Sequence, residues 1–154
     1  MIRRKNIVRD SEFKEKVIDL RRVTRVVAGG KRFRFRVTIL LGDERGRIGL
    51  GIAKGSDVQD AISKAKNKAK KNMIAIPLNG RTINHEVIAK YGAARVLLKP
   101  AVEGHGLKAG GAVRFVLSLV GIKDITAKCL GRTKNKLTNA RATLSALKMI
   151  KTRQ

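Results

Sequence analysis

The most regular alternation of hydrophobic and polar residues lies between positions 32 and 41. Its apolar members are Phe33, Phe35, Val37, Ile39 and Leu41, and its polar members are Arg32, Arg34, Arg36 and Thr38. Because successive side chains of a β-strand point to opposite faces, this pattern predicts a strand with one apolar face and one arginine face. The apolar residues of 17–27 and 47–53 predict two further strands.

Glycines mark the turns between these three strands. Gly29-Gly30 separates the first two, because residues that tolerate positive φ suit a tight hairpin. The segment Gly42–Gly46 separates the second from the third. The third strand carries only small residues on one face, Gly49, Gly51 and Ala53, which indicates close approach by another backbone.

A helix is predicted after these strands. Ser56-Asp-Val-Gln59 has the pattern of a capping box, in which side chains satisfy free N–H groups of the first turn. From there to about Met73, apolar residues at helical spacing form one narrow stripe and lysines occupy the other faces. We therefore expect residues 17–75 to form three antiparallel strands with one helix on their apolar face. A flexible basic arm is expected at residues 1–16.

A second domain is predicted for residues 76–154, because Pro77 and the polar residues after it mark a boundary. Its predicted elements are strands near Val87-Ile88 and Arg95–Leu98, a glycine-rich loop at 104–111, a helix at Ala112–Val120 stopped by Gly121, a strand at about Asp124–Leu130, a basic loop at 131–136, and a final helix buried through Ala140, Leu144 and Leu147. The predicted fold class is α+β, with a β-β-β-α domain followed by a βαβα domain.

The net charge of +25, from 36 Lys and Arg against 11 Asp and Glu, indicates a polyanionic partner. A hydrophobic fraction of 43% argues against disorder as the cause of so much charge. Nucleic acid is the expected polyanion, because its phosphates release condensed counterions when they meet Lys and Arg. Aromatic residues make up only 3% of the chain, which favours recognition of RNA shape and phosphates over stacking of splayed bases.

The arginine face and the lysine-rich helix supply most of the candidate RNA contacts. Alternate residues on a strand lie about 6.6 Å apart, close to the spacing of successive phosphates, and arginine binds phosphate bidentately. An ordinary solvated face is the alternative for both, although such faces normally mix acids with bases. The candidate RNA-binding residues are Arg25, Lys31, Arg32, Arg34, Arg36, Arg47, Lys54, Lys64, Lys68, Lys71, Arg132 and Lys134.

Catalysis, metal binding and cofactor binding have little support in the sequence. His85, His105 and Glu103 lack a nucleophile or second carboxylate beside them. The single Cys129, which we expect to be a packed core thiol, cannot form a thiolate cluster. The loop at 104–111 is neither G-x-G-x-x-G nor a P-loop, so neither a cofactor nor a small-molecule substrate is expected.

Localisation is predicted from the absence of membrane and secretion signals. Apolar runs are too short for a membrane span, and the N-terminal segment lacks the apolar core of a secretory signal. We therefore expect a reducing, cytosol-like compartment, with an organelle matrix as the alternative.

Five segments follow one another in an order that is typical of one family. They are Val27-Ala-Gly-Gly-Lys-Arg-Phe-Arg-Phe-Arg-Val37, Gly42-Asp-Glu-Arg-Gly-Arg-Ile-Gly-Leu-Gly-Ile-Ala-Lys-Gly55, Ala65-Lys-Asn-Lys-Ala-Lys-Lys-Asn-Met73, Lys99-Pro-Ala-Val-Glu-Gly-His-Gly-Leu-Lys-Ala-Gly-Gly-Ala-Val-Arg114 and Arg141-Ala-Thr143. Over residues 12–150 the chain resembles the ribosomal protein S5 family. The loop at 131–139 departs from the family pattern, because it has no proline and one extra residue. His105 stands where a small polar residue is usual.

The resemblance implies a structural constituent of the small ribosomal subunit, a ribonucleoprotein of the cytoplasm that serves translation. It implies a first domain similar to a double-stranded-RNA-binding fold without its first helix. The second domain would resemble the left-handed βαβ fold of the S5 domain-two group. The short C-terminal part, without the long extensions of cytosolic eukaryotic relatives, favours a bacterial-type member.

The resemblance also implies partners and places for particular residues. The partners would be 16S-type ribosomal RNA and the ribosomal proteins S4 and S8, with the messenger-RNA path nearby and a role in translational accuracy. By motif position, Gly104 and Arg114 would lie on the S4 side. The hairpin loop near the subunit neck would consist of Val27, Ala28, Gly29, Gly30 and Lys31.

Two other functions stay open at this point. A double-stranded-RNA-binding protein outside the ribosome would normally have an N-terminal helix, and residues 1–16 supply no convincing one. An enzyme would need a carboxylate or nucleophile cluster, which the sequence does not offer.

Overall fold

The computed structural model describes residues 13–78 and 80–151. In chain order the elements are β1 (Lys14–Val27), β2 (Gly30–Gly42), β3 (Arg47–Gly55), α1 (Val58–Lys71), β4 (Met73–Ala75), β5 (Val87–Tyr91), β6 (Ala94–Pro100), β7 (Leu107–Lys108), α2 (Gly111–Val120), β8 (Ile125–Cys129) and α3 (Lys136–Lys148). Most of the basic arm expected at 1–16 lies outside the described residues, and its last residues, Lys14–Lys16, already belong to β1.

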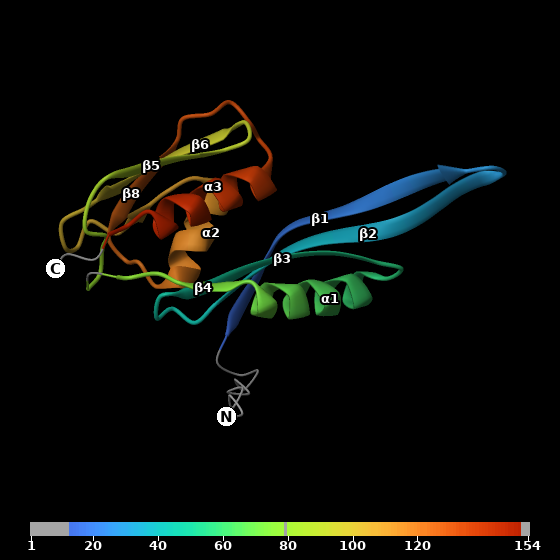
Figure 1. Cartoon of the computed structure of the whole chain (residues 1–154), viewed down its shortest axis with the longest axis horizontal. Helices are drawn as coiled ribbons and strands as arrows, with labels where there is room; N and C mark the ends of the chain where they lie inside the picture. The colour runs from blue at the N-terminus through green and yellow to red at the C-terminus, as the bar shows by residue number, and fades with distance from the viewer. Residues whose placement is uncertain (1–12, 79, 152–154) are drawn as a thin grey trace, which may run out of the picture.

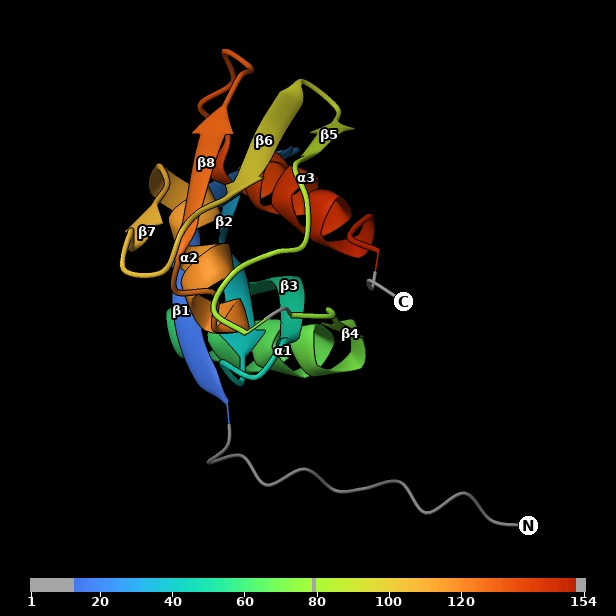
Figure 2. The same cartoon turned by 90° about the vertical axis from the view of Figure 1, so that its left-hand side faces the viewer.

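The elements stack in four layers, which can be followed from two sides (Figure 1, Figure 2). α1 covers the outer face of a first sheet, whose strands pair antiparallel in the order β1-β2-β3-β4. α2 and α3 lie between this sheet and a second one of order β5-β6-β8-β7, in which β7 and β8 pair parallel. The predicted α+β class, with a β-β-β-α unit followed by a βαβα-like unit, is confirmed.

α1 packs against β3 with almost no side-chain volume between the two backbones. Its buried residues Ala61, Ala65 and Ala69 recur every four positions, which places them on one face of the helix. A Cβ atom added to Gly51 of β3 would overlap the carbonyl oxygen of Ala65, and one added to Gly49 would overlap that of Ala69. The small residues on this face of β3 therefore serve close approach, as the sequence predicted.

The opposite face of β2 and β3 is buried as well. Leu40 and Ile48 are fully buried, in one hydrophobic cluster with Val113, Val116 and Leu117 of α2. The sequence predicted a helix on one face of this sheet, but it did not predict that the second domain covers the other face. The two domains consequently share a hydrophobic core.

The turn between β2 and β3 caps the C-terminal end of α2. The last four carbonyl groups of a helix have no partner within it. Two of the four are satisfied by the residues just after the helix, where Gly121 has the left-handed φ of 99° that ends a helix as predicted. The other two, on Leu119 and Val120, accept hydrogen bonds from the backbone N–H groups of Glu44 (3.0 Å) and Gly46 (2.9 Å). The domains are thus joined by backbone hydrogen bonds as well as by apolar contact.

The ends of α1 and the positions of two short strands differ from the prediction, because tertiary contacts decide them. The N-cap of α1 is Asp57, whose carboxylate accepts the N–H of Gln59 at 3.3 Å, so the assignment of the cap to Ser56 was wrong. α1 ends at Lys71 instead of Met73, because Met73–Ala75 pair with β3 and form β4. The strand β7 within the glycine-rich loop was also not predicted, since it exists only through its pairing with β8.

The tight turn of the β1–β2 hairpin lies one residue earlier than predicted. Val27 pairs with Gly30, so Ala28 and Gly29 are the two central residues. Gly29 has a φ of 86°, while Ala28 is not among the residues with positive φ. This is the pattern of a type II turn, which requires a positive φ at its second central residue.

We expect Gly51→Ala to destabilise the fold by about 1–3 kcal/mol, because the new methyl group must push α1 away from β3. The measurement is the midpoint of urea denaturation. Gly110→Ala is the matched control, since Gly110 has a φ of −93° and nothing within 4 Å of an added Cβ. Equal midpoints for the two variants would contradict the close packing of α1 on β3.

Candidate nucleic-acid interface

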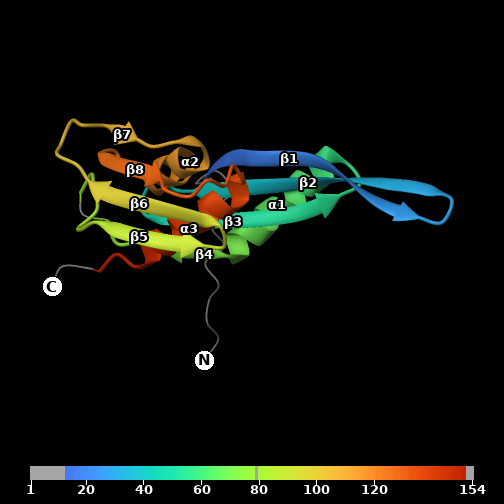
Figure 3. The ribbon, with the colours of Figure 1, turned by 90° about the horizontal axis from the view of Figure 1, so that it is seen from above.

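The outer half of the β1–β2 hairpin projects beyond the rest of the molecule (Figure 3). β1 and β2 pair along their whole length, but β3 joins β2 only from Phe35 to Gly42. Residues 23–34 therefore form a two-stranded ribbon, which has little stability of its own in water. Such a ribbon is suited to contact a partner rather than to support the core.

One face of the hairpin is strongly basic. Residues opposite each other in antiparallel strands share a face, and like charges placed opposite destabilise the pair. Arg25 lies opposite Arg32, and Arg36 lies opposite both Arg21 and Lys54. The buried Asp19 forms a salt bridge of 2.8 Å with Arg21 at the root of the hairpin. Residues 20–42 contain no acid, so the outer arginines lack an internal counter-charge from their own strands.

The basic face is hollowed. The first domain has two separate hollows, of ≈ 350 Å³ and ≈ 440 Å³. The larger of these two lies on the hairpin. Its lining residues are Val23, Thr24, Arg25, Val27, Arg32, Arg34 and Lys54. Four predicted RNA-binding residues thus meet around one hollow, and the half-buried Arg36 lies beside them on the same face.

The other face of the hairpin is mixed. The guanidinium carbon of Arg22 lies 3.8 Å from the centre of the Phe33 ring, the geometry of a cation–π contact. Phe33 is 46% exposed, so its expected burial with Val37 was wrong. The reason is that α1 covers the root of the hairpin and leaves the outer ribbon open (Figure 1). Lys31, which pairs with Val26, also belongs to this face and not to the basic one.

The lysines of α1 form a second basic surface on the opposite side of the first sheet. Lys64 is bound to Asp60 at 2.7 Å, one helical turn away. Lys68 and Lys71 take part in none of the salt bridges found within residues 13–78 and 80–151. The structure therefore separates the predicted helix contacts from the arginine face instead of joining them.

Arg47 has a partner within the chain. Its Nε donates a hydrogen bond of 2.6 Å to Asp43, which also accepts the backbone N–H groups of Arg45 and Arg47. Burial raises the pKa of Asp43, but these hydrogen bonds outweigh burial and leave the pKa lowered. Arg47 thus braces the β2–β3 turn that caps α2, a role that its place in the alternating pattern did not reveal.

A buried carboxylate holds the glycine-rich loop of the second domain. Asp124 accepts the N–H of Gly106 at 2.8 Å and the Nε of Arg81 at 2.8 Å, and Arg81 also reaches Glu103 at 3.2 Å. The hydrogen bond from Gly106 is the main cause that lowers the pKa of Asp124, with Arg81 acting in the same direction against burial. Sequence reasoning missed this group, because Arg81 and Asp124 stand far apart in the chain without any motif spacing.

The remaining candidate residues are exposed on the second domain. Gly104 lies in the loop held by Asp124, and Arg114 lies on α2. Arg132 and Lys134 lie in the loop between β8 and α3, on the side toward which the hairpin projects (Figure 1). The imidazole of His105 contacts Thr126, with 3.1 Å between its Nε2 and the Oγ1 of the threonine.

No group of three or more His, Cys, Asp or Glu residues suited to a metal ion occurs within 13–78 and 80–151. Cys129 is half-buried and packs against the core as predicted. In the described part of the chain, no helix has the length and hydropathy that a membrane span requires.

We expect Asp124→Asn to lower the melting temperature at pH 7. A lowered folded pKa means that Asp124 contributes stability above the unfolded pKa of about 4 and loses this contribution as the pH falls through the folded pKa. The difference in melting temperature between variant and wild type should therefore shrink below about pH 4. Glu103→Gln, which alters the exposed partner of the same arginine, should change little. A difference that stays constant from pH 7 to pH 3 would refute the role of the charge.

Two protein-family models match the chain in sequence order. Residues 13–77 match the model described as "Ribosomal protein S5, N-terminal domain". Residues 89–154 match the model described as "Ribosomal protein S5, C-terminal domain". The first match covers β1 to β4 with the basic hairpin and α1, and the second covers most of β5 and all elements from β6 to α3.

Proposed function

The chain belongs to the ribosomal protein S5 family, and on that premise we propose that it binds small-subunit ribosomal RNA of the 16S type through the arginine face of the β1–β2 hairpin. The family is structural and non-enzymatic, which removes the enzyme alternative. The chain is accordingly an RNA-binding ribosomal protein with a structural role in the small subunit, where it serves translation as part of a ribonucleoprotein.

One observation carries the proposal. Arg25 lies opposite Arg32, and Arg36 lies opposite Lys54, on strands whose residues 20–42 include no acid. Folding such a face without a counter-ion costs free energy, and RNA phosphates would remove that cost while releasing their own condensed cations. Because the ribbon projects from the body, it can enter a groove of folded RNA.

The other candidate cations extend the proposed interface. Lys68 and Lys71, with Lys64 beside them, would meet a second RNA segment on the far side of the first sheet. Arg132 and Lys134 would add contacts from the second domain. Neutralisation by surfaces that point in different directions would hold several RNA segments together, which is a structural role.

The finer family roles are assigned to particular segments within the same proposal. Val27–Lys31 would lie near the subunit neck, and Gly104 and Arg114 would face S4, a contact that supports translational accuracy. S8 and the messenger-RNA path would be further neighbours, in a ribosome of bacterial type.

We place the domain boundary between residues 75 and 76, although Ile76 packs into the core shared by both domains.

The test of the proposed function is sedimentation of a tagged copy in extract of its native cells, through sucrose at low and high salt. Co-migration with small subunits after the high-salt wash is the expected result. Migration as a free protein, or with other RNA, would favour the double-stranded-RNA-binding alternative outside the ribosome.

We expect Arg32, Arg34 and Arg36 changed together to Gln to weaken binding to naked small-subunit RNA. The slope of log K against log salt should fall by about two to three, as up to three phosphate contacts are lost. A matched control removes the same charge from three exposed lysines outside the candidate set, Lys90, Lys108 and Lys123. If the control flattens the slope as much, the arginine face has no special contact with phosphate.

A further inference from the structure

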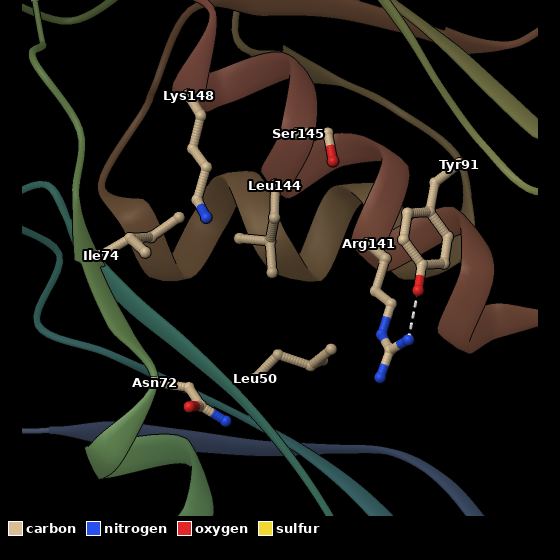
Figure 4. Close-up of a pocket in the computed structure, with 8 residues that line it drawn as sticks. All are labelled: Leu50, Asn72, Ile74, Tyr91, Arg141, Leu144, Ser145 and Lys148. Carbon is tan, nitrogen blue, oxygen red and sulfur yellow. Dashed lines mark hydrogen bonds between the residues drawn. The ribbon is translucent and has the colours of Figure 1, made fainter.

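A cleft of ≈ 270 Å³ separates the two domains on the side of α3 (Figure 4). One wall is a single face of α3, formed by Arg141, Leu144, Ser145 and Lys148. The facing wall belongs to the first domain and consists of Leu50 of β3, Ile74 of β4 and Asn72, the C-cap of α1. Tyr91, the last residue of β5, closes one end.

The charge of the cleft is positive and is not balanced from within. Among the described residues that line it, none is acidic. Neither Arg141 nor Lys148 takes part in a salt bridge within residues 13–78 and 80–151. The two residues are seven positions apart on α3, about 10.5 Å along the axis, so they stand at opposite ends of the wall.

Arg141 is held in position before any ligand arrives. Its guanidinium donates a hydrogen bond to the hydroxyl of Tyr91 and lies 5.3 Å from the centre of the same ring. A fixed cation loses less side-chain entropy on binding than a freely rotating one. In Figure 4 the side chain of Lys148 points from α3 into the same space, and Asn72 lies across from it on the other wall.

The rest of the lining suits a flat, partly apolar group. Leu50, Ile74 and Leu144 are partly buried and pack against the shared core, so they offer an apolar surface between the two cations. The amide of Asn72 can both donate and accept hydrogen bonds, which is what the edge of a nucleobase requires. Unpaired RNA bases are recognised by such a combination of an apolar surface and a polar edge.

We propose that this cleft binds one unpaired nucleotide of the RNA, with its phosphate attracted by Arg141 and Lys148 together and its base on Leu50, Ile74 and Leu144. This inference rests on the proposed function, because it takes RNA as the ligand. A carboxylate of a partner protein would satisfy the cations but fill only a small part of the cleft. A nucleotide seated there contacts both domains and holds them at one distance.

The test is chemical probing of naked small-subunit RNA with the full chain bound. Lys148→Gln removes one cation, and Ser145→Trp fills the cleft without removing a charge. Each variant should lose the protection of the same unpaired nucleotide and keep the protections made by the hairpin. Lys148→Gln should also lower the salt slope by about 0.7 to 0.9. Lys90→Gln, an exposed lysine on the outer face of β5, is the matched control and should change neither.

The outcomes separate this inference from the proposed function. Loss of one nucleotide's protection in both cleft variants supports the inference. An unchanged footprint in both variants overturns the inference. If the variants keep a normal footprint but fail to enter reconstituted subunits, the inference is also wrong, because the cleft then binds a protein. If the wild-type chain protects no nucleotide of this RNA at all, the proposed function is wrong, and so is the inference that the cleft binds a nucleotide.

Discussion

The C-terminal end of α2 is the point on which the arrangement of the two domains depends. Two of its four free carbonyl groups are satisfied by the chain that follows, and the other two by backbone N–H groups of the β2–β3 turn. A buried carbonyl without a partner is costly, so the helix can end there only if the turn is in place. Asp43 and Arg47 keep the turn in that shape, and the apolar faces of the first sheet and α2 close around it.

This junction explains why the basic surfaces point in different directions. α1 covers one face of the first sheet at its root, and the second domain covers most of the other face there. The arginine face is therefore most exposed on the outer ribbon, where β2 extends beyond β3, and Lys64, Lys68 and Lys71 are exposed on the helix surface that faces away from the sheet. The cleft beside α3 opens where the two domains part again beyond the junction.

Local pattern predicted the parts of the structure that local forces decide. The alternation in residues 32–41 and 47–53 gave the strands and their faces correctly, and Gly49 and Gly51 gave the close approach of a backbone. What the pattern could not give is which neighbour covers a face. Phe33 is exposed because α1 stops short of it, and β4 exists because β3 has a free edge.

Among the candidate contacts, Arg25, Arg32 and Arg34 meet as the period predicts. Lys31 turns to the other face and Arg47 bonds to Asp43, both for reasons of pairing that no single segment reveals.

The register of the hairpin also limits how its length can change over evolution. The faces of β2 are fixed at the root, where Val37 and Ile39 are buried beneath α1. Inserting one residue into each strand would turn every outer arginine to the opposite face. Inserting two into each strand would keep the arginines where they are and lengthen the reach by about 6.6 Å. Relatives that probe deeper or shallower grooves should therefore differ in this hairpin by even numbers of residues per strand.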